Sequence, residues 1–151
     1  MNQRTINQQV MEHFDRLKKM YALAPIHKFY EGIELEVEER KSKILLPIDE
    51  RYFHGGMAIH GSVYFKLLDD AAYFACQSVV TDFFLVTTTF NINLLKPIIE
   101  GKIYAVGEVD YVSEKLFKGY SNLYDERGRL CGTGRGQFVK SKLKLETVKD
   151  Y

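Results

Sequence analysis

The chain has 151 residues, about the size of one ordinary domain, and we expect a single domain over residues 1–151. Hydrophobic residues make up 46% and charged residues 27%, and no apolar run approaches the roughly 18 residues of a membrane span, so a soluble protein is expected. The 21 basic and 20 acidic residues nearly cancel, which argues against nucleic acid or an anionic membrane as a partner. The N-terminus lacks the apolar core and cleavage site of a secretory signal, so the sequence predicts a cytoplasmic protein.

The first two segments read as a helix followed by a hairpin. Apolar residues recur at three- and four-residue steps from Ile6 to Leu23, which predicts an amphipathic helix within residues 1–24 that ends at Pro25. Its apolar stripe consists of Ile6, Val10, Phe14, Leu17 and Tyr21. Packing against its own domain is favoured over a membrane or a partner, because acidic residues are mixed in. Alternating residues at 33–37 and 44–48 then predict two antiparallel strands.

Four further strands are predicted after the middle of the chain. They are expected at Phe84 to Leu95, Lys102 to Val112, Gly119 to Tyr124 and Leu130 to Lys140. In the first of these, alternation assigns Val86, Thr88, Phe90, Ile92 and Leu94 to one face. The last carries glycines at 132, 134 and 136, which indicates close approach of another group to that face. Residues 141–151 are expected to form a loose tail.

One helix, starting near Ser62, is predicted between these two groups of strands. Its polar residues fall within a band of about 100° and the remainder of its surface is apolar, so the helix is expected to be almost enclosed by an antiparallel sheet in an α+β domain. The band comprises Ser62, Lys66, Asp69, Asp70, Tyr73 and Gln77. Asp70 is interpreted as a surface bridge with Lys66. Asp69, at the edge of the band, is either a solvated or capped carboxylate or a functional group.

The start of this helix is a second candidate feature. Glycine at 61 leaves the first N–H groups open to an acceptor, and the helix dipole favours an oxygen that gains negative charge there, so an anion or carbonyl site is indicated. Ser62 as a plain N-cap is the alternative, and capping and substrate binding could coexist. His60 is expected to bond backbone in the loop.

These residues resemble a known family. His60-Gly61-Ser62, with Asp69 nine residues after the histidine and Ala72 three further on, resembles the HGGxxxxLxDxA signature of hotdog-fold acyl-CoA thioesterases of the phenylacetate-pathway type. The strand "TTTFNINLLKP" is also similar to that family's, and the likeness covers residues 45 to 140. It implies a hotdog fold, in which the sheet wraps around the central helix. It also implies a homodimer, often paired into a homotetramer, with sites at the subunit interface.

The resemblance also implies roles for three residues. The carboxylate of Asp69 activates water or attacks the thioester itself, the backbone N–H of Gly61 polarises the carbonyl, and Thr87 helps to hold the water. Hydrolysis of an acyl-CoA thioester is therefore the expected function. It needs no metal and no organic cofactor, and the four histidines show no metal-ligand spacing.

The chain departs from the family pattern near the expected substrate. His54 stands where an asparagine is common, and its ring could bond the carbonyl or the water or act as an additional base. Ser62 replaces the second glycine and could narrow the acyl channel. Glu114 and Lys115 stand where a Gly-Lys or Gly-Arg turn is common in the family, so contacts with the CoA phosphates could differ. Lys115 and Lys118 are candidates for those contacts, and a solvated rim is the alternative.

Two other functions fit the same pattern. A non-catalytic acyl-CoA-binding or lipid-binding hotdog protein would keep the fold without turnover. A dehydratase of 3-hydroxyacyl thioesters also pairs a histidine with a helix carboxylate, as His54 and Asp69 do here. Its loop spacing and proline-rich turn are missing from this sequence, so the dehydratase ranks lower.

Overall fold

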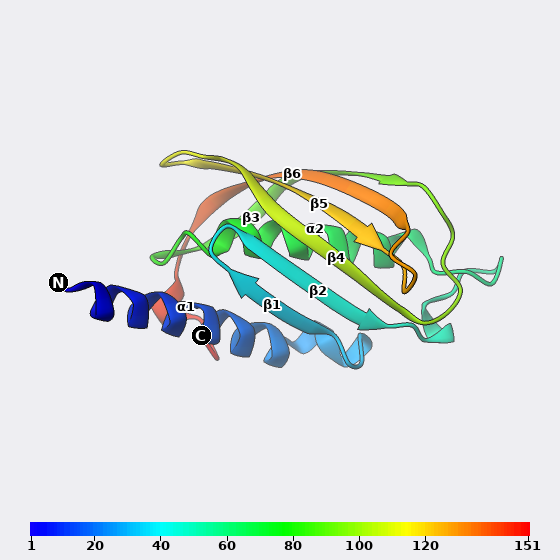
Figure 1. Cartoon of the computed structure of the whole chain (residues 1–151), viewed down its shortest axis with the longest axis horizontal. Helices are drawn as coiled ribbons and strands as arrows, with labels where there is room; N and C mark the ends of the chain where they lie inside the picture. The colour runs from blue at the N-terminus through cyan, green and yellow to red at the C-terminus, as the bar shows by residue number, and fades with distance from the viewer.

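The computed structural model describes all 151 residues and contains one long helix enclosed by a curved sheet. Figure 1 shows this helix, α2 (Gly61–Gln77), behind the sheet, and a second helix, α1 (Gln3–Leu23), alongside one sheet edge. The six strands are antiparallel and lie in the order β1-β2-β4-β5-β6-β3. Their bounds are β1 Glu34–Glu38, β2 Lys41–Pro47, β3 Phe83–Leu94, β4 Lys102–Val112, β5 Leu116–Tyr124 and β6 Leu130–Lys144. The expected α+β hotdog fold is confirmed.

The sheet approaches α2 closely because small residues face each other. A Cβ added at Gly107 of β4 would lie 2.0 Å from the carbonyl oxygen of Ala71, and one at Gly119 of β5 would lie 3.0 Å from that of Ala72. Both alanines are fully buried. The Ser42 hydroxyl donates a hydrogen bond of 2.6 Å to the same Ala71 carbonyl, which anchors β2 to the helix. These contacts hold α2 against the middle of the sheet. One face of the helix, between the edge strands β1 and β3, is not covered by the sheet.

The glycines of β6 make room for an aromatic ring of β3. A Cβ at Gly136 would lie 2.2 Å from the ring of Phe90, and one at Gly134 would lie 2.7 Å from it. A Cβ at Gly132 would come within 3.3 Å of Tyr64 on α2. The close approach predicted for this face of the strand is therefore confirmed.

β3 does not keep one face along its whole length, as the alternation had predicted. Its pairing with β6 shifts register between Thr87 and Thr89, which is the effect of a β-bulge. Before the shift, Leu85 is buried, the Thr87 side chain reaches α2, and Val86 is 39% exposed. After the shift, Phe90 packs against Phe65 of α2. The assignment of Val86 to the same face as Phe90 was wrong, because one extra residue exchanges the two faces of a strand.

Both ends of the chain pack against the same end of α2. The buried part of α1 runs from His13 to Tyr21, whereas Ile6 and Val10, expected on its packed face, are each 40% exposed. His13 is buried and forms two hydrogen bonds through its ring. Its Nε2 lies 3.0 Å from the backbone carbonyl oxygen of Gln77 on α2, and its Nδ1 lies 2.7 Å from the hydroxyl of Tyr151.

The tail expected to be loose from residue 141 is ordered. β6 continues to Lys144, and a short 3₁₀ turn, η3 (Leu145–Thr147), follows it. Leu145 is fully buried, and Val148 packs against the core. The sequence did not predict this order, because three lysines lie near Leu145 and the neighbouring Leu143 is 46% exposed. No helix of the structure is long and apolar enough to cross a membrane.

Candidate active site

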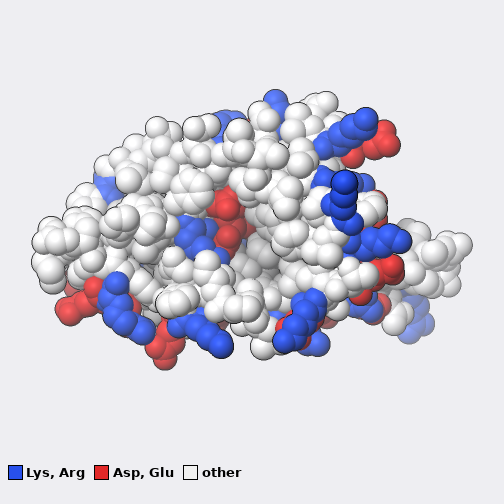
Figure 2. Space-filling view, turned by 180° about the vertical axis from the view of Figure 1, so that it is seen from behind, with Lys and Arg blue, Asp and Glu red and all other residues white.

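A cavity of about 600 Å³ lies on the face of α2 that the sheet does not cover. Its walls come from α2, β3, the end of α1 with the 3₁₀ turn η1 (Pro25–Phe29), and the C-terminal segment. Figure 2 shows acidic and basic side chains at the bottom of a hollow in an otherwise uncharged area of this face. The charged groups that α2 contributes are Lys66, Asp69 and Asp70, and most other lining residues are apolar. Four of the six residues in the polar band predicted from helical periodicity therefore line a cavity, namely Lys66, Asp69, Asp70 and Tyr73, whereas Ser62 and Gln77 do not.

Asp69 lies at the β3 side of this cavity. The Thr87 hydroxyl donates a 3.0 Å hydrogen bond to Oδ1, whereas Oδ2 has no hydrogen-bond partner in the chain and no cation pairs with the carboxylate. Burial raises the pKa of Asp69 to about 6, and the negative charge of Asp70 acts in the same direction. The bond from Thr87 and the charge of Lys66 lower the pKa by smaller amounts. Such a carboxylate is suited to accept a proton near neutral pH.

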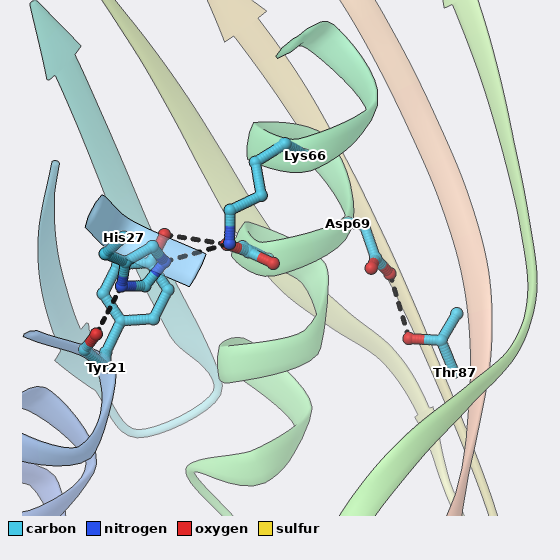
Figure 3. A network of polar contacts seen from close by, with 6 residues as sticks. Tyr21, His27, Lys66, Asp69 and Thr87 are labelled. Carbon is cyan, nitrogen blue, oxygen red and sulfur yellow. Dashed lines mark hydrogen bonds and ion pairs between the residues drawn. The ribbon is translucent and has the colours of Figure 1, made fainter. Parts of the chain in front are cut away.

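Asp70, the adjacent residue, has a different environment. Lys66 Nζ lies 2.6 Å from its Oδ2, and the Tyr21 hydroxyl donates a 2.7 Å bond to the same oxygen (Figure 3). The Lys66–Asp70 pair expected from the sequence is present, but the two side chains are only 13% and 17% exposed, so it is not a surface bridge. The end of α1 covers it, which the periodicity of α2 could not reveal. The two aspartates therefore differ: Asp70 is engaged and Asp69 keeps a free oxygen.

His27 of η1 completes this cluster. Its Nδ1 lies against the backbone carbonyl of Tyr21, so that nitrogen carries the proton, and Nε2 accepts a 3.0 Å hydrogen bond from Lys66. Burial lowers the pKa of His27, and the charge of Lys66 lowers it further, which keeps the ring neutral. Tyr21 and His27 line the cavity. Sequence reasoning missed both as site residues, because no spacing rule connects the end of α1 with α2.

The start of α2 forms a separate feature. His60 is the N-cap, because its Nδ1 accepts the Ser62 N–H at 3.0 Å. The ring thus bonds backbone as expected, and the alternative of Ser62 as the N-cap was wrong. The Gly61 N–H donates to no acceptor in the chain. A second groove of about 290 Å³ passes this point and includes His54, whose Nδ1 accepts the Gly56 N–H at 2.9 Å, and Leu94 of β3.

One chain does not bring Gly61 and Asp69 together. They are eight residues apart on α2, and at 1.5 Å per residue this spacing separates their backbones by about 12 Å along the axis. A single carbonyl group cannot span that distance. Lys115 and Lys118 also lie apart, outside the cavity lining: Lys115 is exposed at the turn between β4 and β5, and Lys118 Nζ lies 5.8 Å from the ring centroid of Tyr111. No three potential metal ligands cluster in the structure.

Known proteins share this architecture. The structure of PaaI from the phenylacetic acid degradation operon of Escherichia coli superposes with a TM-score of 0.80 at 18% identity, covering 89% of this chain and 97% of that one. A thioesterase from Haemophilus influenzae gives a TM-score of 0.71 at 20% identity, with coverages of 80% and 85%. The protein ComA2 of Bacillus subtilis is 26% identical over 114 residues, or 72% of this chain and 90% of its own length. At these identities, the structural matches establish a shared hotdog fold.

The sequence also matches a family directly. Residues 56–132, about half of the chain, match the thioesterase superfamily, and this range includes α2, β3, β4 and β5. The matched range therefore includes the helix that carries the cavity carboxylates and three strands of the hotdog sheet. The chain belongs to the thioesterase superfamily, which supports hydrolysis of a small-molecule thioester as its general activity.

Proposed function

We propose that the protein hydrolyses acyl-CoA thioesters to the free acid and CoA, with Asp69 as the group that activates or delivers the nucleophile. The observation that carries this proposal is the half-buried Asp69 carboxylate, with a pKa of about 6 and a free Oδ2 in an apolar cavity. Thr87 fixes Oδ1, which leaves Oδ2 to take a proton from water or to attack directly. In the first case the water oxygen bonds to the acyl carbon, the carbon–sulfur bond breaks, and CoA leaves as a thiolate.

The carbonyl oxygen needs a donor that Asp69's own chain does not supply. We propose that it is the N–H of Gly61 of the partner subunit in a homodimer. β3 is an edge strand of the sheet. Two of its side chains face α2: Thr87, which contacts Asp69, and Leu94, which lies beside Gly61. Both can face the helix although they are seven residues apart, because the bulge between them shifts the alternation by one residue. Antiparallel pairing of β3 with its copy, centred midway between these two positions, brings Leu94 of the partner subunit opposite Thr87. Gly61 of the partner subunit then comes next to Asp69.

Exposed apolar residues support burial of this edge. Val86, Leu94, Leu95 and Ile99 on β3 and the segment after it are 39% to 61% exposed. A long, unpaired edge with such residues is a template for strand addition. The β3 edge of one molecule can pair with only one other copy of β3, so this edge forms a dimer and no larger assembly. A tetramer would require a second contact surface.

The remaining candidate residues belong to the CoA side of the proposed site. His60 and Ser62 border the start of α2, where Gly61 would hold the carbonyl, and His54 lines the groove beside it. The exposed ring of His54 could form a hydrogen bond with the substrate near this carbonyl. We propose that Lys115 and Lys118 contact the CoA phosphates, which ammonium groups bind through charge-assisted hydrogen bonds. The proposed reaction uses no cofactor, since Asp69 and a backbone N–H supply the base and the oxyanion donor.

Release of CoA thiol from a panel of acyl-CoAs tests the proposal. The wild-type protein is expected to turn over at least one substrate, and Asp69→Asn is expected to lose about 10²- to 10⁴-fold in kcat/KM, the usual contribution of a positioned base. Asp82→Asn is the matched control, because Asp82 lies outside the cavity and pairs with Lys140 at 2.9 Å. Equal rates for Asp69→Asn and the wild type would contradict the proposal. Binding of acyl-CoA without turnover would support a binding protein instead, and hydration of an enoyl thioester would support the dehydratase.

A further inference from the structure

One wall of the α2 cavity comes from a part of the chain that the superfamily match does not include. The match begins at residue 56, whereas the cavity is also lined by residues of the segment from Met20 to His27. This segment, here called the wall segment, comprises the last turn of α1, the residue Ala24 that ends it, and the start of η1. It faces Asp69 and Thr87 across the exposed face of α2, as Figure 3 shows for Tyr21 and His27.

Buried polar contacts hold the wall segment in place. The Tyr21 hydroxyl bonds Asp70, and His27 Nε2 accepts a bond from Lys66, so both ends of the segment are attached to α2. Tyr21 itself is 4% exposed, and its ring packs edge-on against Phe74 at 5.1 Å between centroids. Because a buried polar group that loses its partner is costly, these contacts oppose displacement of the wall by a ligand.

The chemistry of the wall indicates what can occupy the cavity. Lys66 and Asp70 neutralise each other, His27 is neutral, and the Tyr21 proton is engaged by Asp70. Besides Asp69, the remaining charged residues of the lining are therefore Lys149 and Asp150 of the C-terminal segment, so the wall segment itself presents no unpaired charge to the cavity. Leu23, Ala24 and Ile26 add apolar surface on the same side. The volume of about 600 Å³ is within the usual range for sites that enclose small ligands, roughly 300–1,000 Å³. An apolar acyl chain fits this lining better than a charged one.

We propose that the wall segment closes the far end of the acyl pocket and so limits the length of the acyl chain that the protein accepts. The inference rests on the proposed thioester hydrolysis. With its thioester carbonyl at Asp69, an acyl chain extends across α2 away from β3 and meets the wall formed by Ala24 and His27. Short apolar chains fit without contact with the wall, and longer ones are excluded by it.

Ala24→Phe tests this inference, because Ala24 lines the cavity, is only half-buried, and makes no side-chain hydrogen bond. The added ring shortens the pocket from its far end. For straight-chain substrates from acetyl-CoA to lauroyl-CoA, the longest chain that the wild type accepts should lose about tenfold or more in kcat/KM, because a hydrophobic pocket discriminates by roughly 10- to 200-fold per methylene. The kcat/KM for acetyl-CoA, whose acyl group does not reach the wall, should fall by much less than that for the longest chain.

Ala22→Phe is the matched control, because Ala22 is an exposed residue of the same turn and does not line the cavity. It should leave the chain-length profile unchanged. If Ala24→Phe folds poorly, Ala24→Leu makes the same change with less added volume. If the wild type hydrolyses acyl-CoAs and a folded Ala24 variant shows the same dependence of kcat/KM on chain length, the inference is overturned. Absence of hydrolysis by the wild type, or equal rates for the wild type and Asp69→Asn, would instead overturn the proposed function.

Discussion

Removal of the Asp69 charge should make the folded protein more stable at alkaline pH. Burial raises the folded-state pKa of Asp69 from 3.8 to about 6, so the folded chain keeps this proton to higher pH than the unfolded chain. Between about pH 4 and 6 the folded state binds more protons, and the free energy of unfolding therefore decreases as pH rises through this window. A shift of about 2 pKa units corresponds to about 3 kcal/mol, and partial solvent exposure of the carboxylate reduces the expected cost to about 1–3 kcal/mol.

Asp69→Asn removes this cost, because the amide is neutral at every pH and its oxygen can still accept the Thr87 bond. Urea unfolding at fixed protein concentration should give equal stabilities for the two proteins at about pH 4, and an advantage of about 1–3 kcal/mol for the variant at about pH 8. In thermal unfolding, this advantage raises Tm by roughly 2–4 °C per kcal/mol.

Asp82→Asn supplies the opposite control. The hydrogen bond from Lys140 lowers the pKa of Asp82, so this carboxylate stabilises the fold above its unfolded-state pKa, and the substitution should be destabilising at about pH 8. If the difference in free energy of unfolding between Asp69→Asn and the wild type stays constant from pH 4 to 8, ionisation of Asp69 does not destabilise the folded state and this reasoning is wrong.

Three further predictions concern the same site and its support. The wild-type kcat/KM should rise with pH and level off above about 6, because Asp69 must be ionised to act, and a flat profile would contradict this role. Thr87→Val should move that rise to higher pH, because the bond from Thr87 lowers the Asp69 pKa, and an unmoved midpoint would argue against the bond. Gly136→Ala should destabilise the protein by about 1–3 kcal/mol, since its Cβ would lie 2.2 Å from Phe90, whereas Gly55→Ala, with no atom within 4 Å, should cost little in a thermal unfolding assay.

Local periodicity was sufficient to predict most of the elements. β4 has the predicted bounds, Lys102–Val112, because alternating residues begin the strand and turn residues stand at both of its ends. The polar band of α2 identified Asp69 as a boundary residue, since a helix fixes which side chains share a face whatever surrounds it. The same rule could not show whether that face meets solvent, a partner or a cavity.

The remaining features depend on contacts between distant segments. The bulge in β3 places Thr87 toward Asp69, and a period of two cannot detect an inserted residue whose neighbours are all threonines. The wall segment meets α2 through Tyr21 and His27, which are separated from Asp70 and Lys66 by more than one element. The tail was misjudged for the same reason, because Leu145 is buried only when the end of β6 reaches the α1 side of the molecule.

Subunit mixing tests the shared site most directly. Gly61→Pro removes the N–H at the first helical position, where proline is tolerated, and His60 already has the extended conformation that a following proline requires. Asp69→Asn and Gly61→Pro homodimers should each be nearly inactive. Unfolded, mixed in equal amounts and refolded together, they should regain about a quarter of wild-type activity, because half of the dimers are mixed and each of those has one intact site. No regained activity from mixed dimers shown to form would contradict a site built from Asp69 of one subunit and Gly61 of the other.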